Sequence, residues 1–195
     1  MKNKQLMEKI KNISKKEMSK NKRFHDYAHT LSVFNNAKEI IRGEKIENKV
    51  DSLVILTAAL FHDLSNHDGL REGIDGARKS KKILEKLGGF PKDKIKDVER
   101  LIISHVKKYE EIVELDERIL ADADHVDALS KLSICRGFML YAKRGLKLHD
   151  ALLDFQAYIN KKQKHFFTKT AKRMADKQTP FIKKFLDDCL VIYKK

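Results

Sequence analysis

The 195-residue sequence has no tryptophan, only two prolines, eight glycines and two cysteines. Because Cys135 and Cys189 lie far apart without another thiol nearby, a disulfide framework and a thiolate metal site are excluded. We expect both to be small buried hydrophobic side chains. The scarcity of proline and glycine favours helices throughout. Hydrophobic residues make up 42% of the chain, which excludes wholesale disorder.

Long apolar runs are also missing. The longest, residues 53–61, is interrupted by Thr57 and is far shorter than the ~20 residues that a membrane-spanning helix needs. The first residues are polar and basic and never develop the apolar core of a signal peptide. The sequence therefore predicts a cytosolic protein that has no membrane partner.

Acidic residues are outnumbered by basic ones, 28 to 42, which gives a formal net charge of +14. This balance favours anionic partners such as nucleotides, nucleic acid or phosphorylated metabolites. The excess is mostly lysine spread along the chain, with no arginine-rich or glycine-aromatic RNA motif. A solvated basic surface is therefore favoured over a dedicated nucleic-acid interface.

Apolar residues recur at helical spacing along the whole chain, which predicts one all-α domain over residues 1–195. Asp26 and Asp75 are the expected N-caps of two helices, and Thr179-Pro180 is the expected start of the last one. Residues 65–75 are rich in turn-forming side chains and predict a polar loop. Other helices are expected over residues 48–62, 91–105 and 115–129, the first of them apolar nearly all round and therefore central.

Four His-Asp dipeptides occur, and only His62-Asp63 ends an apolar helix. An imidazole and a carboxylate at the end of a buried helix must be paired, coordinated or hydrogen-bonded, because an unpaired buried charge is costly. A divalent cation satisfies both groups at once. Taken alone, the pair is equally well explained as a satisfied polar group of the core.

Two further segments offer ligands of the same kind. His29 shares a helix face with Val33 and Ala37, so its ring should point to the interior. Residues 119–129 hold three carboxylates on one helix, and at least one of them is expected to point inward. Three separate helices thus offer a histidine, a His-Asp pair and a distant aspartate, which is a far less accidental set than any single residue.

These residues, in this order, resemble the HD-domain metal-dependent phosphohydrolases, and in particular their small standalone prokaryotic members. The resemblance is carried by His29 with its apolar stripe, by Ala59-Leu60-Phe61-His62-Asp63-Leu64 and by Ala123-Asp124-His125-Val126-Asp127-Ala128-Leu129. The motif region covers residues 24–129. The resemblance implies a compact helical bundle, which residues 130–195 complete as a C-terminal helical extension. Ser65 stands where the family often has glycine, which affects the loop conformation rather than the ligands.

The resemblance implies that His29, His62, Asp63 and Asp124 bind one divalent metal ion. Asp124 is preferred to Asp122, because family members place the ligand two residues before an apolar one, whereas Asp122 is followed two places on by another aspartate. Mixed imidazole and carboxylate ligands suit Mn, Fe, Co, Ni or Zn better than Mg. Such an ion polarises a phosphoryl oxygen and activates a water molecule, which Asp63 is a candidate to orient.

The expected function is therefore hydrolysis of a nucleotide or another small phosphorylated metabolite. A metal-containing module that senses a nucleotide without turnover, and a nucleic-acid-binding protein that uses the basic surface, are the alternatives.

Four other residues are candidates for roles around the metal. His67, directly after the His-Asp pair, is a candidate general acid, and Arg71 a candidate phosphate contact. Both belong to the 65–75 loop, which forms either the rim of the substrate pocket or an ordinary exposed connector. His25 is a candidate contact for a leaving-group phosphate or a surface residue. His105 is expected to face the substrate or to support the ligands.

Overall fold

The computed structural model describes residues 2–20, 26–65 and 70–194. All regular secondary structure in these ranges is helical, so the predicted all-α fold is confirmed. The α-helices are α1 (Lys2–Met18), α2 (Tyr27–Glu44), α3 (Ser52–Phe61), α4 (Leu70–Leu87), α5 (Ile95–Ser104), α6 (Leu115–Ala128), α7 (Lys131–Lys143), α8 (Leu148–Lys162) and α9 (Lys169–Leu190), with 3-10 helices at Lys92–Lys94, Tyr109–Glu111 and Val191–Lys194.

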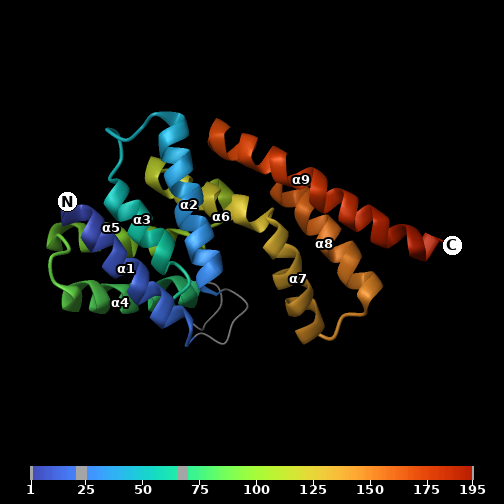
Figure 1. The fold of residues 1–195 in the computed structure, drawn as a ribbon, viewed down its shortest axis with the longest axis horizontal. Coiled ribbons are helices and arrows are strands. Elements are labelled where there is room, and N and C mark those ends of the chain that lie inside the picture. The colour runs from blue at the N-terminus through green and yellow to red at the C-terminus, as the bar shows by residue number, and fades with distance from the viewer. Residues whose placement is uncertain (1, 21–25, 66–69, 195) are drawn as a thin grey trace.

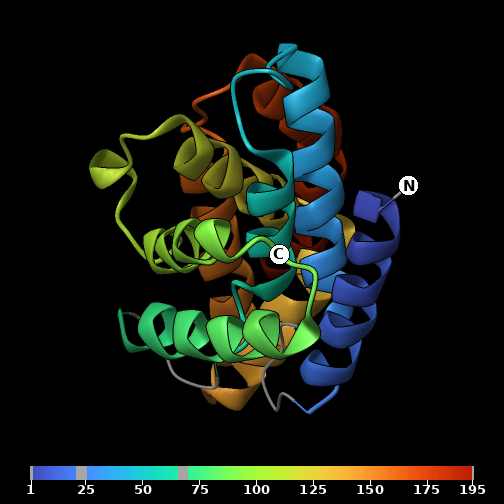
Figure 2. The ribbon, with the colours of Figure 1, turned by 90° about the vertical axis from the view of Figure 1, so that its left-hand side faces the viewer.

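The larger hydrophobic core surrounds α3, the central helix that the sequence predicts. Asp51 caps this helix by accepting hydrogen bonds from the backbone N–H groups of Leu53 and Val54. Ile55 and residues 58–61 are completely buried. Helices α1, α2, α4, α5 and α6 surround α3, and Figures 1 and 2 show this group on one side of the molecule.

A second, smaller core lies between α7, α8 and α9, on the other side of the molecule in Figure 1. Its buried members include Phe155, Ile159, Ile182 and Leu186. The extension therefore buries apolar surface of its own. It is also joined to the first core, because Glu44 at the end of α2 accepts a hydrogen bond from the backbone N–H of Thr170 in α9 (2.7 Å).

A loop was expected over residues 65–75, but residues 70–75 are helical. α4 begins at Leu70, so Asp75 lies inside the helix and does not cap it. Gly73 was a misleading turn signal, because it lies inside α4 and, like Gly76 beyond the expected loop, allows close helix packing. A Cβ on Gly73 would lie 3.2 Å from the Ile103 Cα in α5, and one on Gly76 would lie 3.4 Å from the His62 carbonyl oxygen. α4 therefore packs closely against α5 and against the end of α3.

Two smaller expectations are also wrong. α9 does not start at Thr179-Pro180 but runs through it, and the Thr179 hydroxyl donates a hydrogen bond to the Ala175 carbonyl (2.8 Å). Burial of Ala175 and Ile182 on either side of Pro180 holds the helix together despite the missing N–H. The cysteines are not buried: Cys135 is exposed, and Cys189 is half-buried at the margin of the second core.

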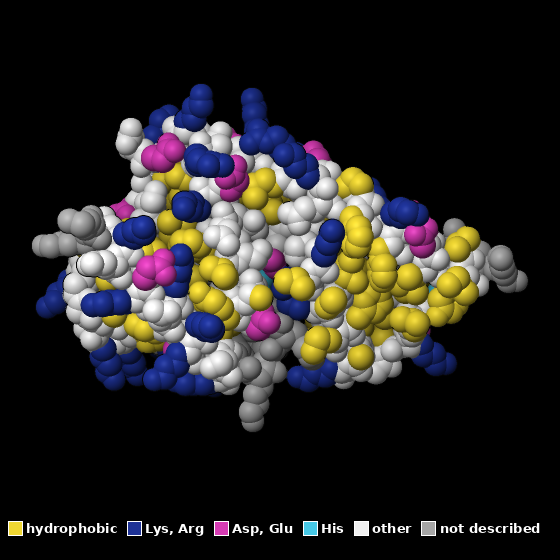
Figure 3. All heavy atoms as spheres, viewed as in Figure 1, with side chains coloured by type: hydrophobic (Ala, Val, Ile, Leu, Met, Phe, Trp, Pro, Cys, Tyr) yellow, Lys and Arg dark blue, Asp and Glu magenta, His cyan; other side chains and the backbone are white. Residues whose placement is uncertain are grey.

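The surface agrees with the dispersed charge of the sequence. Figure 3 shows Lys and Arg side chains scattered over the visible face rather than gathered in one band. The same view shows an apolar area over the C-terminal helices. The exposed large hydrophobic side chains of these helices include Leu132, Met139, Leu148, Leu153 and Phe181. Among the described residues, no helix combines the length and the hydropathy needed to cross a membrane.

The second core has a position that tests its packing. A Cβ on Gly137 of α7 would lie 2.7 Å from Phe155 Cε2, and the Phe155 ring is buried. We expect Gly137→Ala to lower the free energy of unfolding by about 1–3 kcal/mol through overpacking, although glycine-to-alanine normally stabilises a helix. Urea denaturation measures this. Met139→Ala, on an exposed face of the same helix, is the control, and a stabilised Gly137→Ala variant would contradict the packing.

Candidate metal centre

The first element of the site is the start of α2. Asp26 caps the helix, as the sequence predicts, by accepting a hydrogen bond from the backbone N–H of His29 (3.1 Å). The cap fixes His29 in the first helical turn, where its side chain is buried against α3 and α6. The imidazole is therefore held by a rigid element rather than by a loop.

The second element is the end of the central helix. His62 is the C-cap of α3 and Asp63 follows it, and both side chains are buried. The His62 Nδ1–H donates to the Ala59 carbonyl oxygen (2.9 Å), which orients the ring. The Ser14 hydroxyl of α1 donates to the Leu60 carbonyl (2.7 Å), so a neighbouring helix also anchors this last turn.

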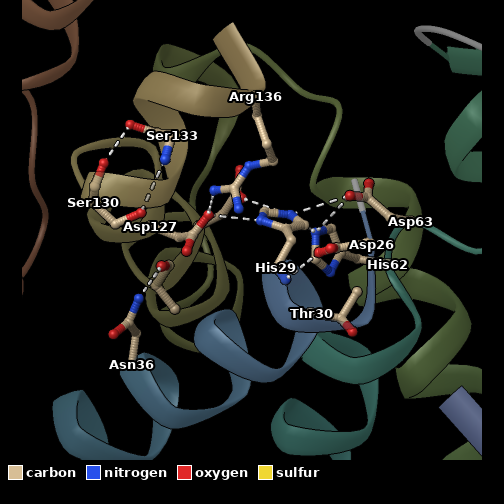
Figure 4. Close-up of polar contacts among 12 residues, drawn as sticks. Asp26, His29, Thr30, Asn36, His62, Asp63, Asp127, Ser130, Ser133 and Arg136 are labelled. Atoms are coloured by element: carbon tan, nitrogen blue, oxygen red, sulfur yellow. Dashed lines mark hydrogen bonds and ion pairs between the residues drawn. The ribbon is translucent and has the colours of Figure 1, made fainter. Parts of the chain in front are cut away.

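The four residues expected as metal ligands come together at one point. The His29 Nε2 atom lies 3.1 Å from His62 Nε2, 3.1 Å from Asp63 Oδ2 and 3.5 Å from Asp124 Oδ1. Ligand atoms of His29, His62 and Asp124 all lie within 4.8 Å of one another. Figure 4 shows His29, His62 and Asp63 pointing toward one another.

The hydrogen bonds of the two rings define what this point can hold. The Nδ1 atoms of His29 and His62 face a carboxylate and a carbonyl, which only accept, so both Nδ1 atoms carry hydrogen. In neutral rings, the two Nε2 atoms then direct lone pairs at each other across 3.1 Å. Only a proton or a cation between them relieves this repulsion. The donor set of two imidazoles and two carboxylates fits a divalent transition metal or zinc.

The electrostatics lead to the same conclusion. Burial lowers the pKa of His29, but hydrogen bonds with Asp127 and Asp63 outweigh burial and raise this pKa to about 10. Burial raises the pKa of Asp124, but the positive charges of His29, His62 and Lys162 lower it to about 2. The cluster therefore favours positive charge at its centre.

Asp122 points away from this cluster. It is completely buried, and its carboxylate accepts hydrogen bonds from the backbone N–H groups of Phe167 (3.0 Å) and Thr168 (2.8 Å) and from the Thr168 hydroxyl (2.7 Å). Asp122 thus anchors the start of α9. Asp124, and not Asp122, faces the two histidines, as preferred from the sequence.

The sequence did not single out Asp127, which lies on the far side of His29. Its Oδ2 atom accepts a hydrogen bond from His29 Nδ1 (2.7 Å), and the same oxygen accepts one from Arg136 of α7. Figure 4 shows Asp127 in contact with both Arg136 and the His29 ring, with Asp63 on the other side of that ring. A carboxylate that accepts the second N–H of a ligand histidine fixes the tautomer and the orientation of the ring.

Asp63 belongs to a second cluster, with Glu72 of α4 and His105 at the end of α5, whose ligand atoms also lie within 4.8 Å of one another. His105 Nε2 lies 3.8 Å from Asp63 Oδ1, while its Nδ1 is hydrogen-bonded to the Ile102 carbonyl. Burial lowers the pKa of His105, so the ring is neutral with a bare Nε2. Glu72 was missed because its segment was expected to be a loop.

The remaining candidates are placed as follows. His25 and His67 lie outside the described residues. Arg71 is exposed on α4, where its Nε lies 3.5 Å from Asp75 Oδ2. His125 turns away from the ligands and stacks on Tyr109, with the ring centroids 6.2 Å apart.

Two side chains of α8, in the C-terminal half, lie close enough to Asp124 to interact with its charge. Lys162 is half-buried, its Nζ atom lies 5.7 Å from the centroid of the Tyr158 ring, and its charge acts on Asp124. Burial lowers the pKa of Lys162. Burial raises the pKa of Tyr158, and the charge of Asp124 raises it further.

Comparison with known proteins identifies the family of this chain. The family model for the HD domain matches residues 26–129, the part of the chain that carries all four converging side chains. The chain therefore belongs to the HD-domain family. No curated protein matches it.

Several solved structures share the fold over nearly their whole length. An HD-superfamily hydrolase from Bacillus thuringiensis is 22% identical, with a TM-score of 0.73 and coverage of 98% of each chain. A predicted HD-superfamily hydrolase from an uncultured Thermotogales bacterium is 26% identical, with a TM-score of 0.63 and coverage of 95% of this chain and 92% of that one. YpgQ of Bacillus subtilis, solved in complex with ADP, is 20% identical, with a TM-score of 0.73 and coverage of 97% and 96%.

The two aspartates of α6 give a direct test of the ligand set. We expect Asp124→Asn to lose most of the bound metal on dialysis, because it removes a charged ligand. Asp122→Asn should keep its metal but lower the free energy of unfolding by about 1–3 kcal/mol, since it disturbs buried hydrogen bonds. Elemental analysis measures the metal content of both variants, and urea denaturation measures their free energy of unfolding. Metal loss from Asp122→Asn alone would show that the wrong carboxylate was chosen.

Proposed function

We propose that this protein is a metal-dependent phosphohydrolase that acts on a nucleotide or another small phosphorylated metabolite. The observation that carries the proposal is the convergence of the His29 and His62 Nε2 atoms with the Asp63 and Asp124 carboxylates at one point, where Asp124 is partly exposed and the other three side chains are buried. A divalent cation held by His29, His62, Asp63 and Asp124 would polarise a phosphoryl oxygen and lower the pKa of a water molecule.

The protein side chains around this point suit a hydrolytic reaction. Asp63 lies between the two clusters, so one of its oxygens faces the ligand cluster while the other faces His105. This position allows Asp63 to orient the attacking water. The neutral His105 ring and the Glu72 carboxylate lie within reach of the same water, and we assign them to accept its proton.

The phosphate groups of the substrate would contact the C-terminal side of the site. Lys162 approaches Asp124 there, and among the described residues no acidic side chain forms an ion pair with its Nζ atom. An ammonium group in a half-buried position suits a phosphate oxygen. The ADP bound to YpgQ, which shares this fold, supports a nucleotide as the substrate. His25, His67 and Arg71 stay candidates for further contacts.

Elemental analysis and a substrate screen test the proposal. The metal content of the purified protein is measured first, and nucleoside mono-, di- and triphosphates and pyrophosphate are then assayed with the loaded protein. We expect stoichiometric metal and phosphate release that Asp124→Asn abolishes. Tight nucleotide binding without turnover would instead support a sensing module. Loss of activity on metal removal, reversed by adding the metal back, is the control.

Lys162 offers a sharp test of the substrate side. We expect Lys162→Met to raise KM for the substrate found in the screen about tenfold, equivalent to ~1.4 kcal/mol, because a charge-assisted contact to phosphate is lost. Metal content should not change. Lys161→Met, the neighbouring exposed lysine, is the matched control. Equal kinetics of the two variants would show that Lys162 does not bind the phosphate.

A further inference from the structure

The corner between α6 and α7 is built from four polar residues spaced three apart: Asp127, Ser130, Ser133 and Arg136. The Ser130 N–H donates to the Asp127 carbonyl (2.9 Å), and the Ser130 side chain caps α7 by accepting from the Ser133 N–H (3.3 Å). The Ser133 hydroxyl donates back to the Ser130 carbonyl (2.7 Å). These bonds fix the direction in which α7 leaves the corner, as Figure 4 shows.

Because α7 leaves at this angle, Arg136 points back toward the ligand cluster. Its guanidinium donates to Asp127 Oδ2, the same oxygen that accepts from His29 Nδ1. The Arg136 side chain is only 14% exposed and that of Asp127 only 1%. The paired charges are thus largely shielded from water, where a charge-assisted hydrogen bond has its greatest effect.

From this chain of contacts we infer that Arg136 is a positioning residue for the metal centre, acting through Asp127 on His29. Arg136 holds the Asp127 carboxylate against the His29 Nδ1–H. That hydrogen bond keeps a hydrogen on His29 Nδ1 and so directs Nε2, the nitrogen that a metal ion would take, toward His62, Asp63 and Asp124. The inference rests on the proposed metal centre. It goes further by predicting that metal affinity depends on Arg136, a side chain of the C-terminal half.

The position of Arg136 on α7 links the metal centre to the second hydrophobic core. Its helix contributes Ile134 to the second core, while Asp127 belongs to the helix that carries Asp124. The contact therefore crosses from one hydrophobic core to the other. If α7 shifts, Asp127 loses its cationic partner, and the support of His29 weakens.

The test measures metal affinity rather than turnover. The dissociation constant of Mn²⁺ is determined by chelator competition for the wild type, Arg136→Met, Arg136→Lys, Asp127→Asn and the double variant. We expect Arg136→Met and Asp127→Asn to weaken Mn²⁺ binding tenfold or more. Arg136→Lys, which keeps the charge, should lie between Arg136→Met and the wild type. Because Arg136 acts through Asp127, the double variant should bind no more weakly than Asp127→Asn alone.

Arg144→Met, at the exposed C-terminal end of α7, is the matched control and should bind Mn²⁺ like the wild type. The inference would be overturned if the double variant bound Mn²⁺ more weakly than Asp127→Asn alone. Unchanged Mn²⁺ affinity of Arg136→Met would also overturn it. If Arg136→Met does not fold, Arg136→Lys provides the comparison: weaker Mn²⁺ binding than in the wild type supports the inference, and wild-type affinity overturns it.

A second readout does not need metal. In the metal-free protein, the His29 Nδ1–H proton gives a downfield ¹H NMR signature because it is hydrogen-bonded to Asp127, whether the ring is neutral or protonated, and we expect this Nδ1–H signature to shift or broaden in Arg136→Met but not in Arg144→Met. An unchanged signature would count against the inference. A wild-type protein that binds Mn²⁺ but hydrolyses no phosphate would contradict the proposed function and leave this inference standing.

Discussion

The hydrogen bond from His29 Nδ1 to Asp127 is the interaction on which the site depends. It uses the one nitrogen of the ring that does not face the other ligands, and so it decides what the remaining nitrogen presents to them. The carbonyl of Ala59 does the same for His62. With both outer nitrogens used as donors, the inner ones of neutral rings can only accept. The centre is therefore built to receive a positive charge.

Such a centre is costly to bury, and the fold offsets the cost by placing it where helices end. His29 lies in the first turn of α2, and His62 and Asp63 lie at the end of α3, so the neighbouring backbone groups are available to cap and orient the side chains. The apolar body of α3 keeps this end in place. Close packing at Gly73 and Gly76 then brings Glu72 of α4 beside Asp63.

The sequence predicted the parts of this arrangement that follow from local patterns. The apolar run of α3, the Asp26 cap and the order of the four converging residues are all visible along the chain. The parts it missed depend on contacts between distant segments. Glu72 lies among turn-forming residues, and only the packing of α4 on α5 makes them helical. From the sequence, Asp127 is only one member of a motif, because its role needs a histidine 98 positions earlier in the chain.

Asp122 and Asp124 show how one helix serves both halves of the molecule. Residues two positions apart on a helix point in widely different directions. The Asp124 carboxylate therefore faces the histidines, while the Asp122 carboxylate anchors the start of α9. Asp127 in turn reaches His29 and Arg136. α6 therefore contributes to the ligand cluster and, at the same time, holds α7 and α9. The C-terminal helices lie against the site because the helix that carries its last ligand also fixes their position.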